Sequence, residues 1–361
     1  MNFNNLFLKS FRVLLLPIAI LYGLVIMIRN LFFDKKWLES AHFNFPLICV
    51  GNLAVGGTGK SPMVEYLVTL LSNQCEIATL SRGYKRKTKG YALANEHTTA
   101  LEIGDEPMQF YLKHPNIAVA VGEERLVGIP HLLQDKPNLQ AIILDDAFQH
   151  RTVNAGFNIL LTEYSNLYTK DFFLPTGDLR DERASAKRAN IIVVTKCPPD
   201  LSEEKKAWIL RELRPSPAQR VFFTTIQYGI PYHICDVAEK CIITQEDEVL
   251  LVCGIANPKP LKDYLLNNTH AYYQQDYSDH HIFSIDDLND IFQKFEAITY
   301  KDKLILTTEK DAVRLIKFRE QLTNVPLYVM PIRHRFLFDE GSQFDELVVN
   351  FIRYFSFNPE S

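Results

Sequence analysis

The stretch GNLAVGGTGKSP, residues 51–62, follows an apolar run at 45–50 and precedes a segment with helical spacing of its apolar residues, 61–72. A strand, a glycine-rich turn and a helix in this order are typical of a phosphate-binding loop, because the amides of the turn and the helix N-terminus both attract anionic oxygens. The loop matches the pattern GxxxxGK[ST] except at its first position, where Ala54 replaces glycine. A glycine-rich turn without a ligand is the alternative.

The residues of this loop suit the chemistry of a phosphate cradle. Glycines allow positive φ and a close approach of the backbone to a phosphate, a lysine can reach the β- and γ-phosphates, and a serine hydroxyl can bind Mg²⁺. The sequence therefore predicts a nucleotide site formed by Gly56, Gly57, Thr58, Gly59, Lys60 and Ser61.

The totals describe an ordinary globular chain. Its 361 residues are 47% hydrophobic and 23% charged, which is long enough for two domains and an accessory segment. A net charge of −4 provides no basic footprint, so we expect no nucleic-acid partner. The six cysteines form no CxxC pair, which indicates free thiols in a reducing compartment.

The N-terminal segment departs from this picture. Residues 13–28 carry no charge and have basic residues on both sides. As a helix this run is about 24 Å long, short of the ~30 Å hydrocarbon core, so it spans a bilayer only with tilting or thinning, and lying in one leaflet is the alternative. No small-residue cleavage site follows Ile28, which disfavours a signal peptide, and apolar residues on all faces disfavour a core helix. Residues 1–36 are predicted to be a membrane-associated helix.

The rest of the chain alternates short apolar runs with amphipathic stretches, the pattern of a parallel sheet covered by helices. We predict a P-loop NTPase-like, doubly wound, mostly parallel sheet in residues 37–222 and a smaller C-terminal α/β domain in residues 223–361, with a hinge at the strand 219–227. The predicted first-domain strands are 45–50, 76–80, 117–121, 140–145, 157–162 and 190–195, with helices at 61–72, 105–113 and 200–216. Those of the second domain are strands 249–255, 303–308 and 326–331 and helices 259–266, 286–295 and 310–318.

Two aspartates follow a predicted strand at a position suited to a metal. Asp145 and Asp146 come directly after the apolar run 141–144. Open α/β sheets bind ligands at the carboxyl ends of their strands, and a carboxylate there can hold the Mg²⁺ that bridges nucleotide phosphates. A turn or a helix cap is the alternative for this pair.

A phosphoryl transferase also needs a group that takes the acceptor's proton or orients water. The candidates are the acidic residues of GDEPMQF (104–110) and the histidines of DHHIF (279–283). From spacing alone, helix capping is the favoured interpretation of the acidic residues, and a solvated or core pair that of the histidines. A regulatory NTPase at the membrane is the rival class. TKCP (195–198) stands where a guanine-recognising NKxD would, but it lacks the aspartate.

Several short motifs occur together in one order along nearly the whole chain. The motifs are SRGY (81–84), GDEPM (104–108), DDAFQH (145–150), LPTGDLRD (174–181), GIANP (254–258), DHH (279–281) and TTEKDAVRL (307–315). With the inner loop, this set resembles the tetraacyldisaccharide 4'-kinase family, the membrane-associated kinases of lipid A assembly in Gram-negative bacteria.

The resemblance implies a reaction and roles for named residues. The acceptor would be the 4'-hydroxyl of a tetraacylated glucosamine disaccharide 1-phosphate, with ATP as donor and Mg²⁺ as cofactor. Asp105 would be the general base, oriented by His280, while Asp145 and Asp146 would handle Mg²⁺. Arg180 would contact phosphate or substrate, and the other expected substrate contacts are Arg82 and Glu106.

Further expectations and alternatives accompany this assignment. The basic segment SRGYKRKTKG (81–90) would meet anionic headgroups or the substrate's 1-phosphate, with a solvated basic loop as the alternative. TTEKDAVRL is interpreted as a strand end and a capped helix rather than a catalytic element. Ala147 and the residues flanking Arg180 depart from the family pattern. Closure of the two domains would assemble the site, in a monomer on the cytoplasmic face of the inner membrane. A non-enzymatic membrane scaffold is the third possibility.

Overall fold

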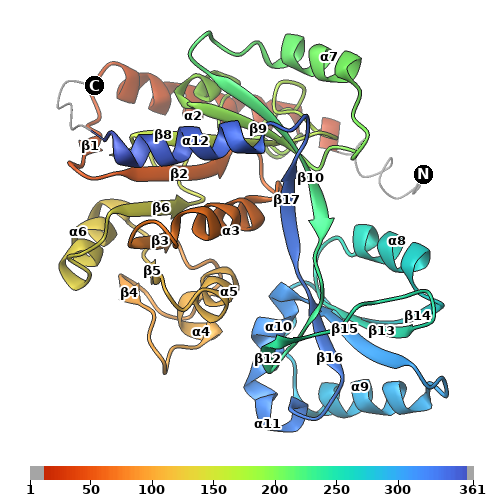
Figure 1. Ribbon diagram of the computed structural model, residues 1–361. Coiled ribbons are helices and arrows are strands. Elements are labelled where there is room, and N and C mark those ends of the chain that lie inside the picture. Colours follow the sequence, from red (N-terminus) through yellow and green to blue (C-terminus); the bar gives the residue numbers. More distant parts are fainter. Residues whose placement is uncertain (1–11, 356–361) are drawn as a thin grey trace.

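The computed structural model describes residues 12–355 and contains two α/β units joined by two neighbouring strands, β10 and β17 (Figure 1). Strand β10, Arg220–Tyr228, leads out of the larger unit, and β17, Ile332–Phe336, returns to it. The two strands pair antiparallel, with Thr224 opposite Phe336 and Tyr228 opposite Ile332. The predicted hinge strand is therefore one of two connecting strands.

The larger unit is built on one mixed sheet. Among the described residues nine strands follow the order β17-β10-β9-β8-β2-β6-β3-β5-β4. Only the two edge strands, β17 and β4, are antiparallel to their neighbours. Continuously apolar strands are typical of a parallel sheet that is covered on both faces, and every residue of β2 is buried. The other strands are β3 Ile77–Ser81, β4 Ala92–Leu93, β5 Ala118–Val121, β6 Ala141–Asp145, β8 Phe157–Glu163 and β9 Ile191–Thr195, with β2 at Leu47–Asn52. A separate parallel pair joins β1, Ala41–His42, to β7, Val153–Asn154.

Helices cover both faces of this sheet. On one face α3, Lys60–Leu71, α5, Asp105–Lys113, and α12, Gly341–Arg353, share an apolar core with the strands. On the other face α6, Arg125–Asp135, and α7, Glu203–Leu213, contribute to a second core. The shorter helices are α4, Ala100–Ile103, and the 3₁₀ turn Arg183–Arg188. The mostly parallel sheet predicted from the sequence is confirmed, and the predicted elements of this unit are present with ends that differ by a few residues.

The smaller unit has a six-stranded sheet within the described chain, in the order β12-β11-β16-β15-β13-β14. Strands β16, β15, β13 and β14 are parallel, and β11 and β12 add an antiparallel edge. The predicted second α/β domain is thus present. Its strands are β11 Tyr232–His233, β12 Asp236–Lys240, β13 Glu248–Cys253, β14 Ala271–Asp276, β15 Lys303–Thr308 and β16 Leu327–Met330, and its helices are α8 Lys259–Asn268, α9 Ile285–Ala297, α10 Glu309–Leu315 and α11 Arg319–Leu322.

The C-terminal end of the chain belongs to the larger unit, which corrects the predicted division into residues 37–222 and 223–361. Strand β17 extends the nine-stranded sheet, and α12 lies across that unit in Figure 1. The physical reason is the apolar stripe of α12, because Phe344 and Val348 are fully buried in the core that α12 shares with α3 and α5. Only about one hundred residues between β10 and β17 form the smaller unit.

Helix α2, Leu16–Asp34, packs against the larger unit through a narrow stripe of its own residues. Its buried residues are Ala19, Gly23, Asn30 and Phe33, and most of its apolar side chains are exposed. A Cβ at Gly23 would lie 2.5 Å from the Phe173 ring, so glycine is needed for the close approach. By length and composition α2 can cross a membrane, and only 22% of its most apolar window is buried. A soluble core helix is therefore disfavoured; residues 1–11 of the predicted membrane segment lie outside the described chain.

The placement of α12 generates a stability prediction. Replacing Phe344 by alanine leaves a cavity among Tyr66, Phe222 and Phe336, whose rings surround it. We expect the free energy of unfolding of the larger unit to fall by about 3–5 kcal/mol. Urea unfolding followed by far-UV circular dichroism measures it, with the exposed Gln343→Ala on the same helix as control. An unchanged unfolding midpoint for F344A would place α12 outside the core.

Candidate active site

The phosphate loop lies between β2 and α3, where the sequence predicts it. Gly56 has φ of 109° and Gly59 has φ of 87°, conformations that side chains rarely adopt. Two side chains hold the backbone and hydroxyl of Thr58: Asn52 Nδ2 donates to its Oγ1 at 2.9 Å, and Thr195 Oγ1 donates to its carbonyl at 2.8 Å. The loop is thus pre-shaped by neighbouring strand ends.

Lys60 and Ser61 extend from the first turn of α3 toward polar partners. Lys60 Nζ lies 3.3 Å from Asn52 Oδ1 and 3.6 Å from Asp146 Oδ1. Ser61 is buried, and its hydroxyl donates to Glu106 Oε1 at 2.8 Å. The loop is therefore connected directly to both acidic groups that the sequence singles out, the pair after β6 and the start of α5.

Asp145 ends β6 beside Val50 of β2. It is buried, and its Oδ1 is a buried atom without a hydrogen-bond partner among the described residues. Burial, together with the negative charges of Glu106 and Asp146, raises the pKa of Asp145 to about 7. A buried carboxylate with a free oxygen is expensive unless a cation meets it, so this residue is suited to a metal.

Asp146 follows with φ of 49° and is strongly paired. The Arg180 guanidinium donates to both of its carboxylate oxygens, with 3.0 Å between Arg180 Nη1 and Asp146 Oδ2. Burial alone would raise the pKa of Asp146, but the hydrogen bonds from Arg180 and the charges of Lys60 and Arg180 hold it below its usual value. The two aspartates that the sequence treats as one pair have opposite environments.

Asp105 begins α5 and receives contacts from the smaller unit. Arg314 Nε and Nη2 donate to Asp105 Oδ2 at 2.9 and 2.7 Å, and His280 Nδ1 lies 2.9 Å from the same oxygen. Arg314 Nη2 also lies 3.2 Å from His280 Nδ1, so the three side chains form one hydrogen-bonded cluster. Among the described residues no side chain or amide bonds Asp105 Oδ1. The site predicted to form from two domains is thus assembled in this structure.

Glu106 connects the phosphate loop to the smaller unit. Its Oε1 accepts from Ser61 Oγ at 2.8 Å and from Lys310 Nζ at 2.5 Å. Burial opposes ionisation, but the Lys310 charge, the Ser61 hydroxyl and the Lys60 charge together keep the pKa of Glu106 below its ordinary value. The structure places this residue beside the loop and Asp145, and none of its contacts tests the expected role in substrate binding.

The two histidines of the DHH motif have different partners. His280 has φ of 62° and turns toward Asp105. His281 instead contacts Asp287 Oδ2 through Nε2 at 2.9 Å and stacks on Tyr277 with a centroid distance of 4.6 Å. Sequence spacing could not separate the two, and the structure brings only the first histidine to the candidate base.

Arg180 lies on a loop that contacts helix α2. The Tyr22 hydroxyl donates to the Arg180 carbonyl at 3.1 Å, and Asn30 Nδ2 donates to Asp181 Oδ1 at 2.8 Å. Arg82 is exposed. Burial, with the nearby charges of Arg125 and Arg82, lowers the pKa of the His150 imidazole to about 4. Of the two predicted substrate arginines, Arg180 therefore lies beside Asp146 and helix α2, and Arg82 lies near His150.

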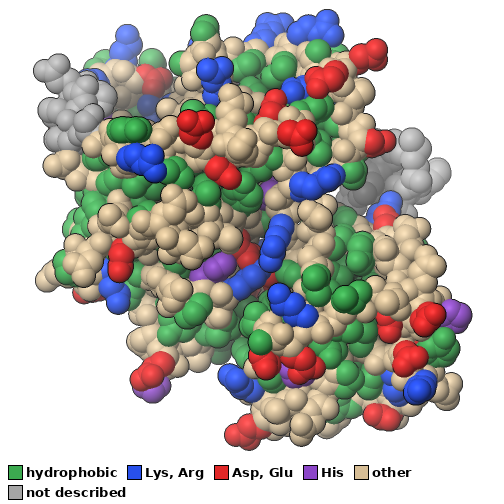
Figure 2. Space-filling model, in the orientation of Figure 1, with side chains coloured by type: hydrophobic (Ala, Val, Ile, Leu, Met, Phe, Trp, Pro, Cys, Tyr) green, Lys and Arg blue, Asp and Glu red, His purple; other side chains and the backbone are tan. Residues whose placement is uncertain are grey.

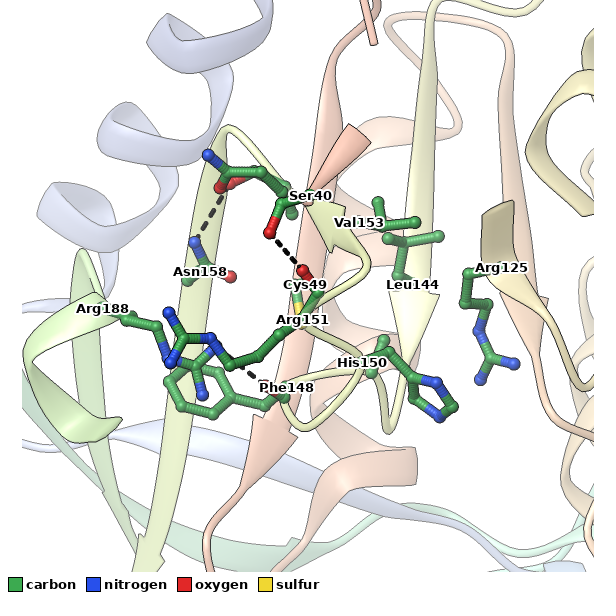
Figure 3. Close-up of a pocket in the computed structure, with 13 residues that line it drawn as sticks. Ser40, Cys49, Arg125, Leu144, Phe148, His150, Arg151, Val153, Asn158 and Arg188 are labelled. Atoms are coloured by element: carbon green, nitrogen blue, oxygen red, sulfur yellow. Dashed lines mark hydrogen bonds between the residues drawn. The ribbon is translucent and has the colours of Figure 1, made fainter. Parts of the chain in front are cut away.

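A cavity of about 270 Å³ borders the segment 144–150, which contains Asp145 and Asp146 (Figure 3). Two arginines beside it support the segment through its carbonyls: Arg125 Nη2 donates to Asp145 O and Arg188 Nη1 to Phe148 O, both at 2.9 Å. These contacts fix the backbone that carries both aspartates. Sequence reasoning missed Arg125 and Arg188, because neither lies in a motif that names its partner.

Sequence reasoning also missed Lys310 and Arg314 as site residues. The segment TTEKDAVRL is the strand end and capped helix that it predicts, since Thr308 Oγ1 accepts from the Asp311 amide at 3.2 Å. The same helix turns Lys310 and Arg314 toward Glu106 and Asp105. Their four-residue spacing puts them on one face of a helix, which is a signal that the sequence does contain. Figure 2 shows acidic, basic and histidine side chains gathered where the two units meet.

His334 of β17 is a further residue without a sequence signal. It is buried, with Nε2 2.9 Å from Gly59 O and Nδ1 2.9 Å from Thr224 Oγ1. Burial lowers the pKa of His334 to about 4, so the ring is neutral near pH 7. A buried neutral imidazole thus touches the phosphate loop.

Comparison with known proteins gives a consistent result. The family model for tetraacyldisaccharide-1-P 4'-kinase matches residues 11–353. The tetraacyldisaccharide 4'-kinase of Flavobacterium johnsoniae is 48% identical over 95% of this chain and 97% of its own length, and that of Bacteroides thetaiotaomicron is 40% identical over 94% and 93%. The crystal structure of LpxK from Aquifex aeolicus in complex with ATP is 27% identical, covers 95% of this chain and 99% of its own, and has a TM-score of 0.73.

The neutral His334 predicts a pH dependence of stability. Its folded-state pKa lies below the ordinary 6.5, so the unfolded chain binds the extra proton first and stability falls as pH drops from about 6.5 toward 4. Between about pH 7 and pH 5, protonation of this residue in the unfolded chain should lower the free energy of unfolding by about 2 kcal/mol. Urea unfolding of the wild type and of His334→Gln measures the difference. Equal losses in the two proteins would show that His334 titrates normally.

Proposed function

Since the chain belongs to the tetraacyldisaccharide 4'-kinase family, we propose that its interdomain site transfers the γ-phosphoryl group of ATP to the 4'-hydroxyl of a tetraacylated glucosamine disaccharide 1-phosphate, in lipid A biosynthesis. One observation supports this assignment above the others. The Asp105 carboxylate, held from the smaller unit, is one residue from Glu106, whose side chain is hydrogen-bonded to Ser61 of the phosphate loop. A candidate base and a candidate phosphate cradle therefore share one site.

The geometry around Asp105 suits a general base. His280 and Arg314 both bond Asp105 Oδ2, which leaves Oδ1 to accept the proton of the attacking hydroxyl. The same two residues keep the carboxylate oriented. Positioned proton transfer of this kind contributes about 10²–10⁴ in rate, or about 3–5 kcal/mol of barrier. His280 is thus assigned a positioning role, and Asp105 the proton transfer.

The cationic residues of the loop side suit the phosphates. Lys60 extends from the N-terminus of α3 and would bind the β- and γ-phosphates, beside the amides of Gly56 to Ser61. Charge on the transferred group is the main quantity to stabilise in phosphoryl transfer, so this side should contribute more than the base does. Arg180, already paired with Asp146, would meet phosphate or substrate.

The donor atoms in the site fit Mg²⁺. Asp145 offers an unpartnered buried oxygen and Ser61 a hydroxyl, while Asp146 is shared with Arg180 and Lys60. No group of three or more His, Cys, Asp or Glu side chains in residues 12–355 could hold a metal by itself. Mg²⁺ commonly takes one or two protein carboxylates and completes its shell with phosphate oxygens and water. When bound there, it neutralises charge on the phosphates.

Helix α2 suits a lipid substrate. A four-chain lipid leaves a bilayer only at about 0.8 kcal/mol per CH₂, so the enzyme must work at the membrane surface. The exposed apolar side chains of α2 lie on the same unit as Arg180 and Arg82. We assign the protein to the cytoplasmic face of the bacterial inner membrane, as a monomer, with the exposed Arg82, Lys85, Lys87 and Lys89 toward anionic headgroups or the substrate's 1-phosphate. The Arg86 side chain of the same segment is instead buried and paired with Glu123.

Point variants test the chemistry in an assay with labelled ATP, Mg²⁺ and a lipid A disaccharide monophosphate. The wild type should transfer label to the lipid. Asp105→Asn and His280→Ala should lower kcat by about 10²–10⁴ and leave nucleotide binding intact, because both act on the acceptor's proton. Lys60→Ala should damage turnover and nucleotide binding together.

The matched control is His281→Ala, which removes the adjacent histidine that pairs with Asp287 and should keep near-normal turnover. Wild-type turnover in D105N would refute the assignment of the base. Label that appears only as free phosphate in the wild-type reaction would favour the regulatory NTPase instead.

The membrane role of α2 is tested by adding charge to its exposed side. Ile20→Glu with Leu24→Glu puts two carboxylates on one face of the helix, at side chains that are 63% and 52% exposed. Each charge in hydrocarbon costs roughly 2.5–3.5 kcal/mol, so co-sedimentation with anionic vesicles should fall about 100-fold or more.

Activity on vesicle-borne substrate should fall in parallel and recover with detergent-dispersed substrate. Leu266→Glu, at an exposed apolar position on α8 of the smaller unit, is the control and should leave vesicle binding unchanged. Full vesicle binding by the double variant would argue against membrane attachment through α2.

A further inference from the structure

His334 lies on a strand that connects the two units, far in sequence from any phosphate-binding motif. Its neighbours on β17, Arg333 and Arg335, are exposed, while the His334 ring is 4% exposed and faces α3 and the loop. A polar ring buried at such a position needs partners for both of its nitrogens. The structure supplies both.

The partners determine the tautomer of the ring. Gly59 O can only accept, so His334 Nε2 carries the proton and donates across 2.9 Å. Nδ1 of the neutral ring is then an acceptor, and it lies 2.9 Å from the Thr224 hydroxyl, which donates to it. Thr224 on β10 is itself fully buried and thereby orients the imidazole.

The carbonyl that His334 holds belongs to a critical peptide. Gly59 is the residue before α3, in a left-handed conformation, and its carbonyl also accepts from the Met63 amide at 3.2 Å. A peptide unit is planar, with C=O and N–H pointing in opposite directions. Fixing Gly59 O therefore fixes the direction of the Lys60 N–H, and with it the start of the Lys60 side chain.

The contact is close as well as polar. A Cβ added at Gly59 would lie 3.1 Å from His334 Cε1 and Nε2, so the ring packs directly against the loop. The preceding carbonyl, Thr58 O, is held by Thr195 Oγ1 at 2.8 Å. Two successive peptides of the loop are thus tied from behind, one to β9 and one to β17.

We propose that His334 is a positioning residue for the phosphate loop, which orients the Gly59–Lys60 peptide so that the Lys60 amide and ammonium meet the phosphates of the nucleotide. This inference rests on the proposed nucleotide site and deepens it. Thr224 is the second member of the device, because it holds the ring with Nε2 toward the loop.

Four variants test the role: His334→Leu removes the donor, His334→Gln keeps an N–H near the position of Nε2, Thr224→Val removes the orienting hydroxyl, and Arg335→Ala is the control on the opposite face of β17. The measurements are the Kd of a non-hydrolysable ATP analogue by calorimetry, KM for ATP, KM for the lipid acceptor, and the melting temperature.

A lost hydrogen bond to the loop should weaken nucleotide binding about tenfold in H334L and raise KM for ATP similarly, with KM for the lipid changed by less than about twofold. H334Q should recover most of the affinity, and T224V should lie between H334L and the wild type. R335A should match the wild type. A merely structural role would lower the melting temperature and move both KM values together.

A wild-type Kd for the nucleotide in H334L would overturn the proposal, as would an H334Q protein that melts normally but binds no better than H334L. If H334L does not fold, H334Q and T224V decide. A T224V protein with the wild-type Kd for the nucleotide and wild-type KM values for both ATP and the lipid would refute the proposed role of Thr224 and His334. Nucleotide binding is measured without lipid. A wild-type protein that binds nucleotide but labels no lipid would therefore refute the proposed function, while the nucleotide affinities would still test the role of His334.

Discussion

The hydrogen-bonded ion pair between Asp105 and Arg314 is the interaction on which the rest of the site depends. It joins the N-terminus of α5 in the larger unit to α10 in the smaller one, through bonds of 2.7 and 2.9 Å. Both side chains are largely buried, so separating them would leave two poorly solvated charges. A second tie runs parallel to it, where Lys113 of α5 lies between Glu65 of α3 and Glu309 of α10. Together these contacts hold the two units in the arrangement that brings His280 to Asp105.

The site alternates acidic and basic groups from the loop outward. Lys60 lies near Asp146, Asp146 is paired with Arg180, and Glu106 lies between Ser61 and Lys310. Asp145 is the exception, since no cationic side chain bonds its buried carboxylate in the described chain. A cluster in which all but one acidic group is neutralised has a defined place for one further cation. The same balance explains why the two adjacent aspartates have pKa values displaced in opposite directions.

The apolar helix and the polar site are physically connected. Helix α2 bonds the loop of Arg180 through Tyr22 and Asn30, and it packs on Phe173 of the same loop. Asn30 is fully buried, and its Nδ2 also lies 2.8 Å from Glu182 Oε1. An otherwise apolar helix thus presents Tyr22 and Asn30 to the loop that carries Arg180. This arrangement joins the exposed apolar helix to the unit that contains the phosphate loop.

The sequence alone determined the elements whose signal is local. Glycines 56 and 59, the strand before them and the helix after them follow from backbone sterics and the periodicity of apolar residues, and the order of motifs was enough to indicate the family. Helix α6 was missed because Gly128 and Pro130 interrupt its pattern, as were the short edge strands. Tertiary structure decided what depends on contacts between distant segments: that α12 returns to the larger unit, that His280 rather than His281 meets the candidate base, and that His334 touches the loop. His280 and His334 are placed by partners that lie 34 to 275 residues away in the sequence, and no local sequence pattern encodes such contacts.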